Sequence, residues 1–300
     1  MKCNVCDTGE MRSFVLGVKD FEYETYHPVD YEKCAACGVL MQNPLPPASL
    51  VPTFYPATYR NYLKEDGALF SFLKCAQEYL FVRFLEKEME ANRGIQILEI
   101  GCGNGALLRA LGRRGFTNLS GCDFSGSTWE EPYIRFRATN VETEFPFEEQ
   151  FDAILMVNVI EHFLNPVAVL ETCRDHLTPG GKLIIITPHA DSLALRVFGL
   201  YWAGFHAPRH VYVFTKKSLE AIAEKLYLQK RTFCFTADVG QWSLSVQNIL
   251  QNKVWARTTL TNGLAWYVAV VSMACIPIAF LQNLMTVRGA GLFYVFEKHK

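Results

Sequence analysis

Four cysteines near the N-terminus have the spacing of a metal site. Cys3 and Cys6 form one Cys-x-x-Cys pair, Cys34 and Cys37 form a second, and 27 residues separate the two pairs. Two such pairs can converge on one ion, and a closed four-thiolate Zn²⁺ site has a structural role. A segment this short buries little apolar surface, so metal binding would supply much of its folding free energy. We therefore expect a zinc ribbon at the N-terminus.

A glycine-rich turn follows an apolar run about a third of the way along the chain. Glu99 lies in that run, which predicts a buried strand, and Gly101, Gly103 and Gly105 precede a predicted helix that begins near Ala106. Such glycines let a ligand approach bare main chain at a helix N-terminus. The turn fits the dinucleotide pattern G-x-G-x-x-A and equally the pattern acid-x-Gly-x-Gly-x-Gly. The turn alone therefore leaves the cofactor open.

Three further segments follow the turn in a recognisable order. Asn118–Cys122 predicts a strand that ends at Asp123, Phe151–Val157 predicts another, and residues 177–188 combine a Pro-Gly-Gly turn with an apolar run. Over residues 95–235 this order resembles the class I S-adenosylmethionine (SAM)-dependent methyltransferases. The resemblance implies a doubly wound, Rossmann-like α/β fold with a seven-stranded, mostly parallel sheet and one antiparallel terminal strand. It also implies SAM as the cofactor.

The resemblance assigns the cofactor contacts residue by residue. Glu99 would bind the methionine amine, and Asp123 would accept hydrogen bonds from the ribose hydroxyls. Phe124 would pack on the adenine. Asn140 stands where many family members have an acid, and its carbonyl oxygen can still accept a hydrogen bond from the adenine amine. The complete expected set is Glu99, Gly101, Gly103, Gly105, Asp123, Phe124, Asn140, Val157 and Asn158.

Histidines are the candidate bases, because methyl transfer to a hydroxyl requires alignment and removal of a proton near neutral pH. His162 follows a predicted strand at the rim where open α/β sheets carry their sites. His210 belongs to Pro208-Arg209-His210, which resembles a signature of one methyltransferase branch. We expect His210 as the base, with His162 second. For each the alternative is a histidine that only bonds a loop. Arg209 would pair with an acidic substrate group or with a local carboxylate.

The N-terminal head also carries a resemblance. After the cysteine pairs come a proline turn at residues 43–47 and an aromatic Tyr-Pro segment at residues 54–62. This arrangement resembles bacterial methyltransferases that tailor sugars and cell-envelope glycans. It implies a small-molecule acceptor, namely a sugar or a lipid-linked glycan intermediate. An apolar face of helical period over residues 69–90 predicts a helix that helps to cover the cofactor.

An apolar segment without charged residues extends from Thr258 to Val287. Its length would allow a membrane span. However, residues 231–235 and 291–297 resemble the last two strands of the sheet, and one span between them would keep them from pairing. We expect a helical hairpin around Pro277. It would contact a membrane or a lipid-like substrate, form a homodimer interface, or pack in the core.

Composition favours a cytoplasmic enzyme that does not bind nucleic acid. The net charge is −1, no Lys/Arg-rich run occurs, and no apolar signal segment follows Met1. If the apolar segment binds a membrane, the protein lies at its inner face. Alternatives are a nicotinamide-dependent oxidoreductase, an inactive SAM-fold scaffold and an RNA methyltransferase. The expected division is a zinc ribbon (1–45), a linker and helical cap (46–93), the SAM-binding core (94–237), an apolar helical insertion (238–288) and the final strand (289–300).

Overall fold

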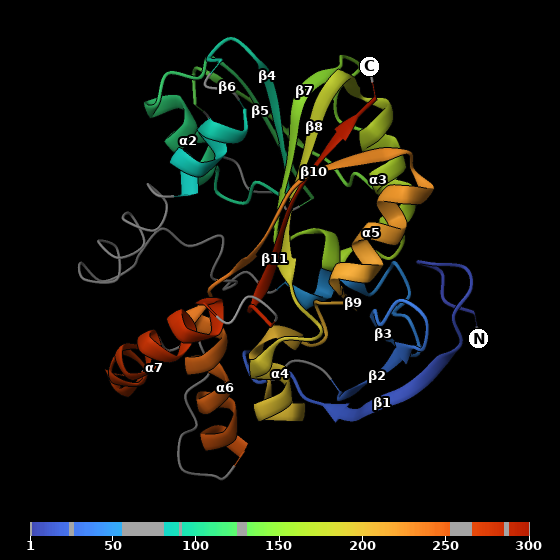
Figure 1. Ribbon diagram of the computed structural model, residues 1–300, viewed down its shortest axis with the longest axis vertical. Helices are drawn as coiled ribbons and strands as arrows, with labels where there is room; N and C mark the ends of the chain where they lie inside the picture. The colour runs from blue at the N-terminus through green and yellow to red at the C-terminus, as the bar shows by residue number, and fades with distance from the viewer. Residues whose placement is uncertain are drawn as a thin grey trace.

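The structure is a computed structural model that describes residues 2–23, 27–55, 81–89, 92–124, 131–252, 266–284 and 288–299. Its main element is a seven-stranded sheet in the order β10-β11-β8-β7-β4-β5-β6 (Figure 1). The strands are β4 (Gln96–Ile100), β5 (Asn118–Asp123), β6 (Ile134–Ala138), β7 (Phe151–Val157), β8 (Leu177–Pro188), β10 (Leu228–Thr236) and β11 (Gly291–Lys298). β11 is antiparallel to β8 and β10, and the other neighbours pair in parallel. The expected methyltransferase-type sheet is confirmed.

Helices cover both faces of this sheet (Figure 1). Adjacent residues of β4 point to opposite faces, as the period of a strand requires. Ile97 packs with Leu111 of α2, whereas Leu98 packs on the other side with Leu170 of α3 and Ile222 of α5. The helical residues 81–88 cover the first face together with α2. The bounds are α2 (Ala106–Arg113), α3 (Pro166–Asp175), α4 (Leu193–Phe198) and α5 (Lys216–Lys225).

The Pro-Gly-Gly segment, which we expected as a turn before a strand, lies inside β8. The register between β7 and β8 shifts between Phe151 and Ala153, so the segment forms an irregularity within the strand. Gly180 has φ of +79°, and a Cβ on Gly181 would lie 2.8 Å from the backbone oxygen of Thr178. Glycine is needed here because the chain folds tightly against itself.

The N-terminal residues form three strands of a second sheet, and a short strand from the core is its fourth strand. Its order is β1-β2-β3-β9, with β1 (Met11–Val18), β2 (Val29–Cys34), β3 (Leu40–Gln42) and β9 (Tyr212–Val213). β3 and β9 are antiparallel, with Leu40 opposite Val213 and Met41 opposite Tyr212. No sequence signal predicts this pairing, because a strand of two residues has no periodic pattern. It joins the cysteine segment to the chain directly after His210.

Two helices form the apolar insertion before β11. They are α6 (Val239–Asn252) and α7 (Trp266–Leu284), and Nε1 of Trp242 donates a hydrogen bond to Oε1 of Gln282 over 2.7 Å. The expected hairpin around Pro277 is wrong, because Pro277 lies inside the continuous helix α7. A proline removes one helix hydrogen bond without necessarily ending the helix. Here Cys275 and Ala279, on either side of it, pack into the same buried cluster as Trp242.

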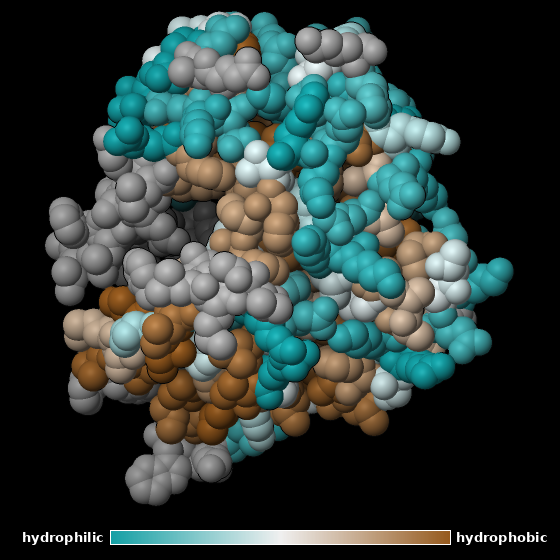
Figure 2. Space-filling view, in the orientation of Figure 1, coloured by the Kyte–Doolittle hydropathy of each residue, from teal (hydrophilic) through white to brown (hydrophobic). Residues whose placement is uncertain are grey.

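The outer face of α7 exposes apolar side chains. Val270, Met273, Ile276, Ile278 and Leu281 are each between 41 and 60% exposed. Figure 2 shows hydrophobic residues gathered over α6 and α7. Among the described residues, no helix has the length and hydropathy required to cross a bilayer.

Parts of three expectations lie outside the described residues. Of the Tyr-Pro segment only residues 54 and 55 are described, and of the helix predicted over residues 69–90 only residues 81–89. Residues 258–265 and 285–287 of the apolar segment are likewise not described.

Candidate cofactor and acceptor site

The glycine turn between β4 and α2 has a conformation that excludes side chains. Gly101, Gly103 and Gly105 have φ of +70°, +53° and +74°, a region that residues with a Cβ rarely adopt. A Cβ on Gly101 would lie 2.4 Å from Cγ2 of Val159. The backbone N–H of Gly103 donates to Oδ2 of Asp123 over 2.9 Å. This bond fixes the turn against the end of β5.

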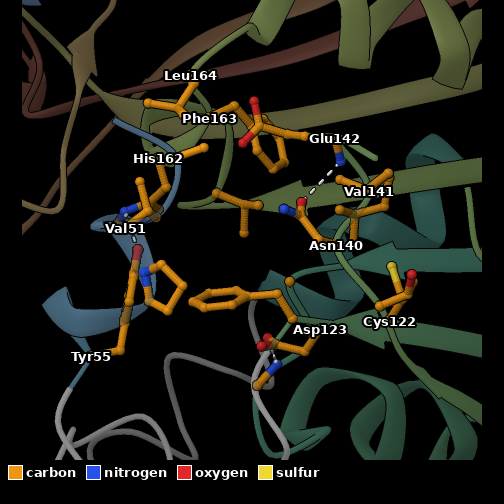
Figure 3. A pocket seen from close by; sticks show the side chains of 18 of the residues that line it. Val51, Tyr55, Cys122, Asp123, Asn140, Val141, Glu142, His162, Phe163 and Leu164 are labelled. Carbon is orange, nitrogen blue, oxygen red and sulfur yellow. Dashed lines mark hydrogen bonds between the residues drawn. The ribbon is translucent and has the colours of Figure 1, made fainter. Parts of the chain in front are cut away.

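A cavity opens at the carboxyl ends of β4, β5 and β7 (Figure 3). This is the position at which open α/β sheets bind ligands. Seven of the predicted site residues line it: Gly101, Gly103, Asp123, Phe124, Asn140, Asn158 and His162. The remaining lining residues are Ala48, Val51, Pro52, Tyr55, Ile100, Cys122, Thr139, Val141, Glu142, Val159, Phe163 and Leu164.

Other predicted cofactor residues lie next to the lining rather than in it. Glu99 is buried within β4. Gly105 is the N-cap of α2, and Val157 is the last residue of β7. The structure therefore places all three next to residues that line the cavity, but not in its lining.

Asn140 organises the loop after β6. Its Oδ1 accepts a hydrogen bond from the backbone N–H of Glu142 over 3.0 Å (Figure 3). An amide oxygen has two lone pairs, so one remains for a ligand. Thr139, Val141 and Glu142 line the cavity beside it. No sequence signal predicts these three residues, because they belong to a loop without a motif.

The opposite wall of the cavity comes from the N-terminal part of the chain. Val51 belongs to η1 (Val51–Phe54), a short 3₁₀ helix, and Tyr55 follows it. The ring of Tyr55 stands edge-on to Phe124 with centroids 4.9 Å apart, and its hydroxyl lies 3.1 Å from Nδ1 of His162 (Figure 3). In the sequence Tyr55 belongs only to the Tyr-Pro segment, and the structure places it in the site.

The two candidate bases, His162 and His210, are neighbours with ring centroids 4.7 Å apart. His162 lies in η3 (Ile160–His162) and lines the cavity. His210 is 4% exposed and lies outside the lining. Nδ1 of His162 is 3.0 Å from the carbonyl oxygen of Arg209, and Nδ1 of His210 is 2.8 Å from that of Gly204. Both rings are therefore held by the backbone.

Burial controls the ionisation of the two histidines and of the glutamate beside them. It lowers the pKa of His162 to about 4 and the pKa of His210 well below its ordinary range. It also raises the pKa of the neighbouring Glu161 to about 7. Both histidines are thus neutral at pH 7, and a group with a pKa near 4 is a weak general base at that pH.

A family model described as a methyltransferase domain matches residues 71–230, which contain the glycine turn, Asp123, Asn140, His162 and His210. The chain belongs to the methyltransferase domain family. It is a class I SAM-dependent methyltransferase, and the family excludes the nicotinamide-dependent oxidoreductase considered above. The bare turn, the Asp123 carboxylate and the adjoining cavity are the groups that a SAM site requires.

Curated relatives of the methyltransferase are named ubiquinone biosynthesis O-methyltransferase. The relative from Dinoroseobacter shibae is 29% identical over 184 residues, which cover 55% of this chain and 73% of the relative. A relative from Cereibacter sphaeroides is 29% identical over 191 residues, with coverages of 56% and 75%.

Solved structures similar to the methyltransferase include a coclaurine N-methyltransferase bound to N-methylheliamine and S-adenosylhomocysteine (SAH). It is 15% identical and has a TM-score of 0.49, with 84% of this chain and 81% of that chain covered. A cyclopropane synthase from Mycobacterium tuberculosis is 17% identical with the same TM-score, and the coverages are 84% and 94%.

Arg209 of the methyltransferase pairs with local carboxylates. Its Nη2 lies 2.6 Å from Oε2 of Glu22 and 3.6 Å from Oδ1 of Asp20. Glu22 also pairs with His206. Arg209 is 1% exposed, so of the two roles weighed for it the structure supports the local ion pair.

The four N-terminal cysteines of the methyltransferase converge. Their sulfur atoms lie within 4.8 Å of one another, with 3.8 Å between Cys3 and Cys37 and 3.6 Å between Cys6 and Cys34. A Cβ on Gly9 would lie 2.1 Å from Sγ of Cys34, so this glycine makes room for the cluster. Four convergent sulfurs from two Cys-x-x-Cys pairs are the donor set that Zn²⁺ prefers.

Proposed function

We propose that this methyltransferase transfers the methyl group of SAM to a hydroxyl oxygen of a small-molecule acceptor. The observation that carries the proposal is one cavity, which is lined both by the glycine turn and Asp123 and by His162 and Tyr55. The names of the relatives, which are O-methyltransferases, support an oxygen acceptor. The chain would align the hydroxyl with the sulfonium methyl group and exclude water around them.

Calorimetric titration of the zinc-loaded protein with SAM tests the cofactor half of the proposal, with NAD as the parallel control. We expect saturable SAM binding that SAH displaces. A panel of phenols, sugars and lipid-linked sugars then tests the acceptor half through SAH release. We expect His162→Ala and His210→Ala to lower turnover while SAM still binds, because His162 lines the cavity and the ring of His210 packs against that of His162. SAM binding without turnover on any hydroxyl compound would favour the inactive scaffold.

The sugar or lipid-linked glycan acceptor remains a proposal that depends on the resemblance of the N-terminal head. The names of the relatives refer to ubiquinone biosynthesis and give it no support. The panel therefore includes phenols and glycans side by side. Retention on RNA that falls with salt would revive the RNA methyltransferase, which the net charge of −1 disfavours.

We further propose that Cys3, Cys6, Cys34 and Cys37 bind one structural Zn²⁺. The support is the convergence of the four sulfurs described above. Elemental analysis should give one zinc per chain, and a Cys37→Ser variant should lose it. A wild-type chain that folds without any bound metal would contradict this proposal.

We also propose a location and a partner for the protein. They are a cytoplasmic location, at the inner face of a membrane if the exposed face of α7 binds lipid, and a homodimer that uses the same face. Flotation with lipid vesicles and light scattering test the two uses of α7.

A further inference from the structure

A second group of metal-binding side chains lies beside the cavity, apart from the four cysteines. Glu161, His162 and His210 each offer one ligand atom, and these atoms lie within 4.8 Å of one another. Glu161 is 0% and His210 4% exposed. A buried carboxylate is stable when it is paired with a cation or coordinates a metal ion.

Hydrogen bonds to the backbone determine which nitrogen of each histidine is available. Nδ1 of His162 faces the carbonyl oxygen of Arg209, and Nδ1 of His210 faces that of Gly204. A carbonyl oxygen can only accept, so Nδ1 carries the hydrogen in both rings, and the hydroxyl oxygen of Tyr55 accepts from Nδ1 of His162 as well. Nε2 of each ring then keeps its lone pair. Metal-binding histidines are held in this way, through an N–H bond from the second nitrogen.

The carboxylate of Glu161 is satisfied on one oxygen only. Oε2 accepts a hydrogen bond from Oγ1 of Thr187 over 2.9 Å, whereas Oε1 has no hydrogen-bond partner among the described residues. Oε1 lies 3.7 Å from Nε2 of His210, beyond hydrogen-bond distance. A nitrogen lone pair and a carboxylate oxygen are both acceptors. Their buried juxtaposition is stable when a cation lies between them.

We propose that Glu161, His162 and His210 bind a divalent transition-metal ion at the wall of the cavity. Two imidazoles and one carboxylate are a ligand set of catalytic metal sites, which keep positions open for a substrate. Because His162 lines the cavity, the open positions would face the ligand bound there. The bond from Thr187 orients the carboxylate, as second-shell bonds do in metal sites.

The role of the ion rests on the proposed function: we propose that the ion binds the acceptor hydroxyl. A divalent cation lowers the pKa of a hydroxyl bound to it. The hydroxyl proton can then leave to solvent without a strong base from the protein. The new O–CH₃ bond forms as the S–CH₃ bond of SAM breaks, and SAH is released.

Cobalt titration of the zinc-loaded protein tests the site. We expect one Co²⁺ per chain beyond the zinc, with weak visible absorption bands and none of the intense charge-transfer absorption of cobalt thiolates. Glu161→Gln and His210→Gln should each weaken Co²⁺ binding by more than about 100-fold, since even outer-shell changes in metal sites cost about 10- to 100-fold.

The matched control is His189→Gln. His189 is 3% exposed and its Nδ1 also faces a backbone carbonyl, that of Gly289, but it does not belong to the group. This variant should bind Co²⁺ like the wild type. SAM titration of each variant shows that it is folded.

The outcomes separate this inference from the proposed function. No Co²⁺ binding beyond the cysteines, or equal binding by Glu161→Gln, overturns the metal site and leaves SAM binding intact. Intense charge-transfer absorption would place the ion on thiolates and also overturn it. Loss of SAM binding by the wild type would instead overturn the proposed function.

Discussion

At the scale of single residues, Asp123 provides the sharpest test of the cofactor site. Its carboxylate lines the cavity and accepts a bond from Gly103. We expect Asp123→Ala to weaken SAM binding at least about tenfold, because a hydrogen bond to a charged group contributes about 1.5–3 kcal/mol. Calorimetric titration measures this. Asp175→Ala, an exposed acid that pairs with Arg174, should leave the affinity unchanged.

Gly101 tests whether the turn must lack side chains. We expect Gly101→Ala to lower the free energy of unfolding by about 2–4 kcal/mol, because the cost of a positive φ and the cost of crowding against Val159 add up. Gly115→Ala should lose only about 1–2 kcal/mol, since the nearest atom to its new Cβ, on Arg93, is 3.9 Å away. Urea unfolding compares them. Adding Val159→Ala to Gly101→Ala should restore the part of the free energy that crowding removes. Equal losses in Gly101→Ala and Gly115→Ala would contradict this account.

The buried pairs of Glu22 give stability a defined pH dependence. Burial alone would raise the pKa of Glu22, but His206, Arg209 and, more weakly, His162 lower it to about 2 from 4.5. Asp20 faces the same arginine. A carboxyl group whose pKa is lowered by folding stabilises the folded state at pH values above its pKa in the unfolded chain. The stability that Glu22 contributes should therefore be present above pH 4.5 and lost as the pH falls toward 2.

Glu22→Gln should therefore lower the free energy of unfolding by on the order of 2 kcal/mol at neutral pH. The difference from the wild type should shrink between pH 4.5 and 2. Urea unfolding across this range measures it, with exposed Glu144→Gln as the control. A difference that did not change with pH would mean that Glu22 acts by packing alone.

At the scale of elements, β2 and β3 hold the loop that carries His210. Nε2 of Gln42 donates to the carbonyl oxygens of Pro208 and His210 over 2.7 and 3.0 Å. The hydroxyl of Tyr31 donates to the same carbonyl oxygen of His210 over 2.6 Å. Gln42→Leu leaves buried carbonyls with fewer donors. We expect it to lower the free energy of unfolding by about 1–3 kcal/mol.

SAM affinity of Gln42→Leu should stay within about twofold of the wild type, because Gln42 does not line the cavity. Urea unfolding and SAM titration together check the prediction. Gln229→Leu, at an exposed position in β10, should be close to neutral. A large loss of SAM affinity in Gln42→Leu would mean that β3 supports the cofactor end directly.

At the scale of the whole molecule, the cysteine segment and the core share one sheet through β9. Loss of zinc should therefore reach beyond the cysteines. We expect Cys34→Ser to accelerate hydrogen exchange at residues 40–42 and 211–213, while β4 and β7 keep their protection. Mass spectrometry of exchanged peptides measures this, with Cys234→Ser, which is not one of the converging cysteines, as the control. Changes confined to residues before 40 would contradict the coupling.

Local patterns determined the parts of the fold whose residues are close in sequence. The apolar run, the glycines and the helix after them predicted β4, the turn and α2, because each signal lies within one element and its neighbour. Asp123 and Asn158 could be placed at strand ends for the same reason. The four cysteines were found because metal-ligand spacing is a sequence property. The pairing of β10 with β11 followed from the family pattern.

Only the tertiary structure decided which distant segments meet. The pairing of β3 with β9, the contact of Tyr55 with His162 and the pairing of Arg209 with Glu22 join residues more than 100 positions apart. No local period encodes such contacts, because they depend on how the completed layers pack. The same holds for Pro277, whose helix continues because its neighbours pack against α6. The approach of Glu161 to His210 follows from β9, which returns the chain to the rim of the main sheet.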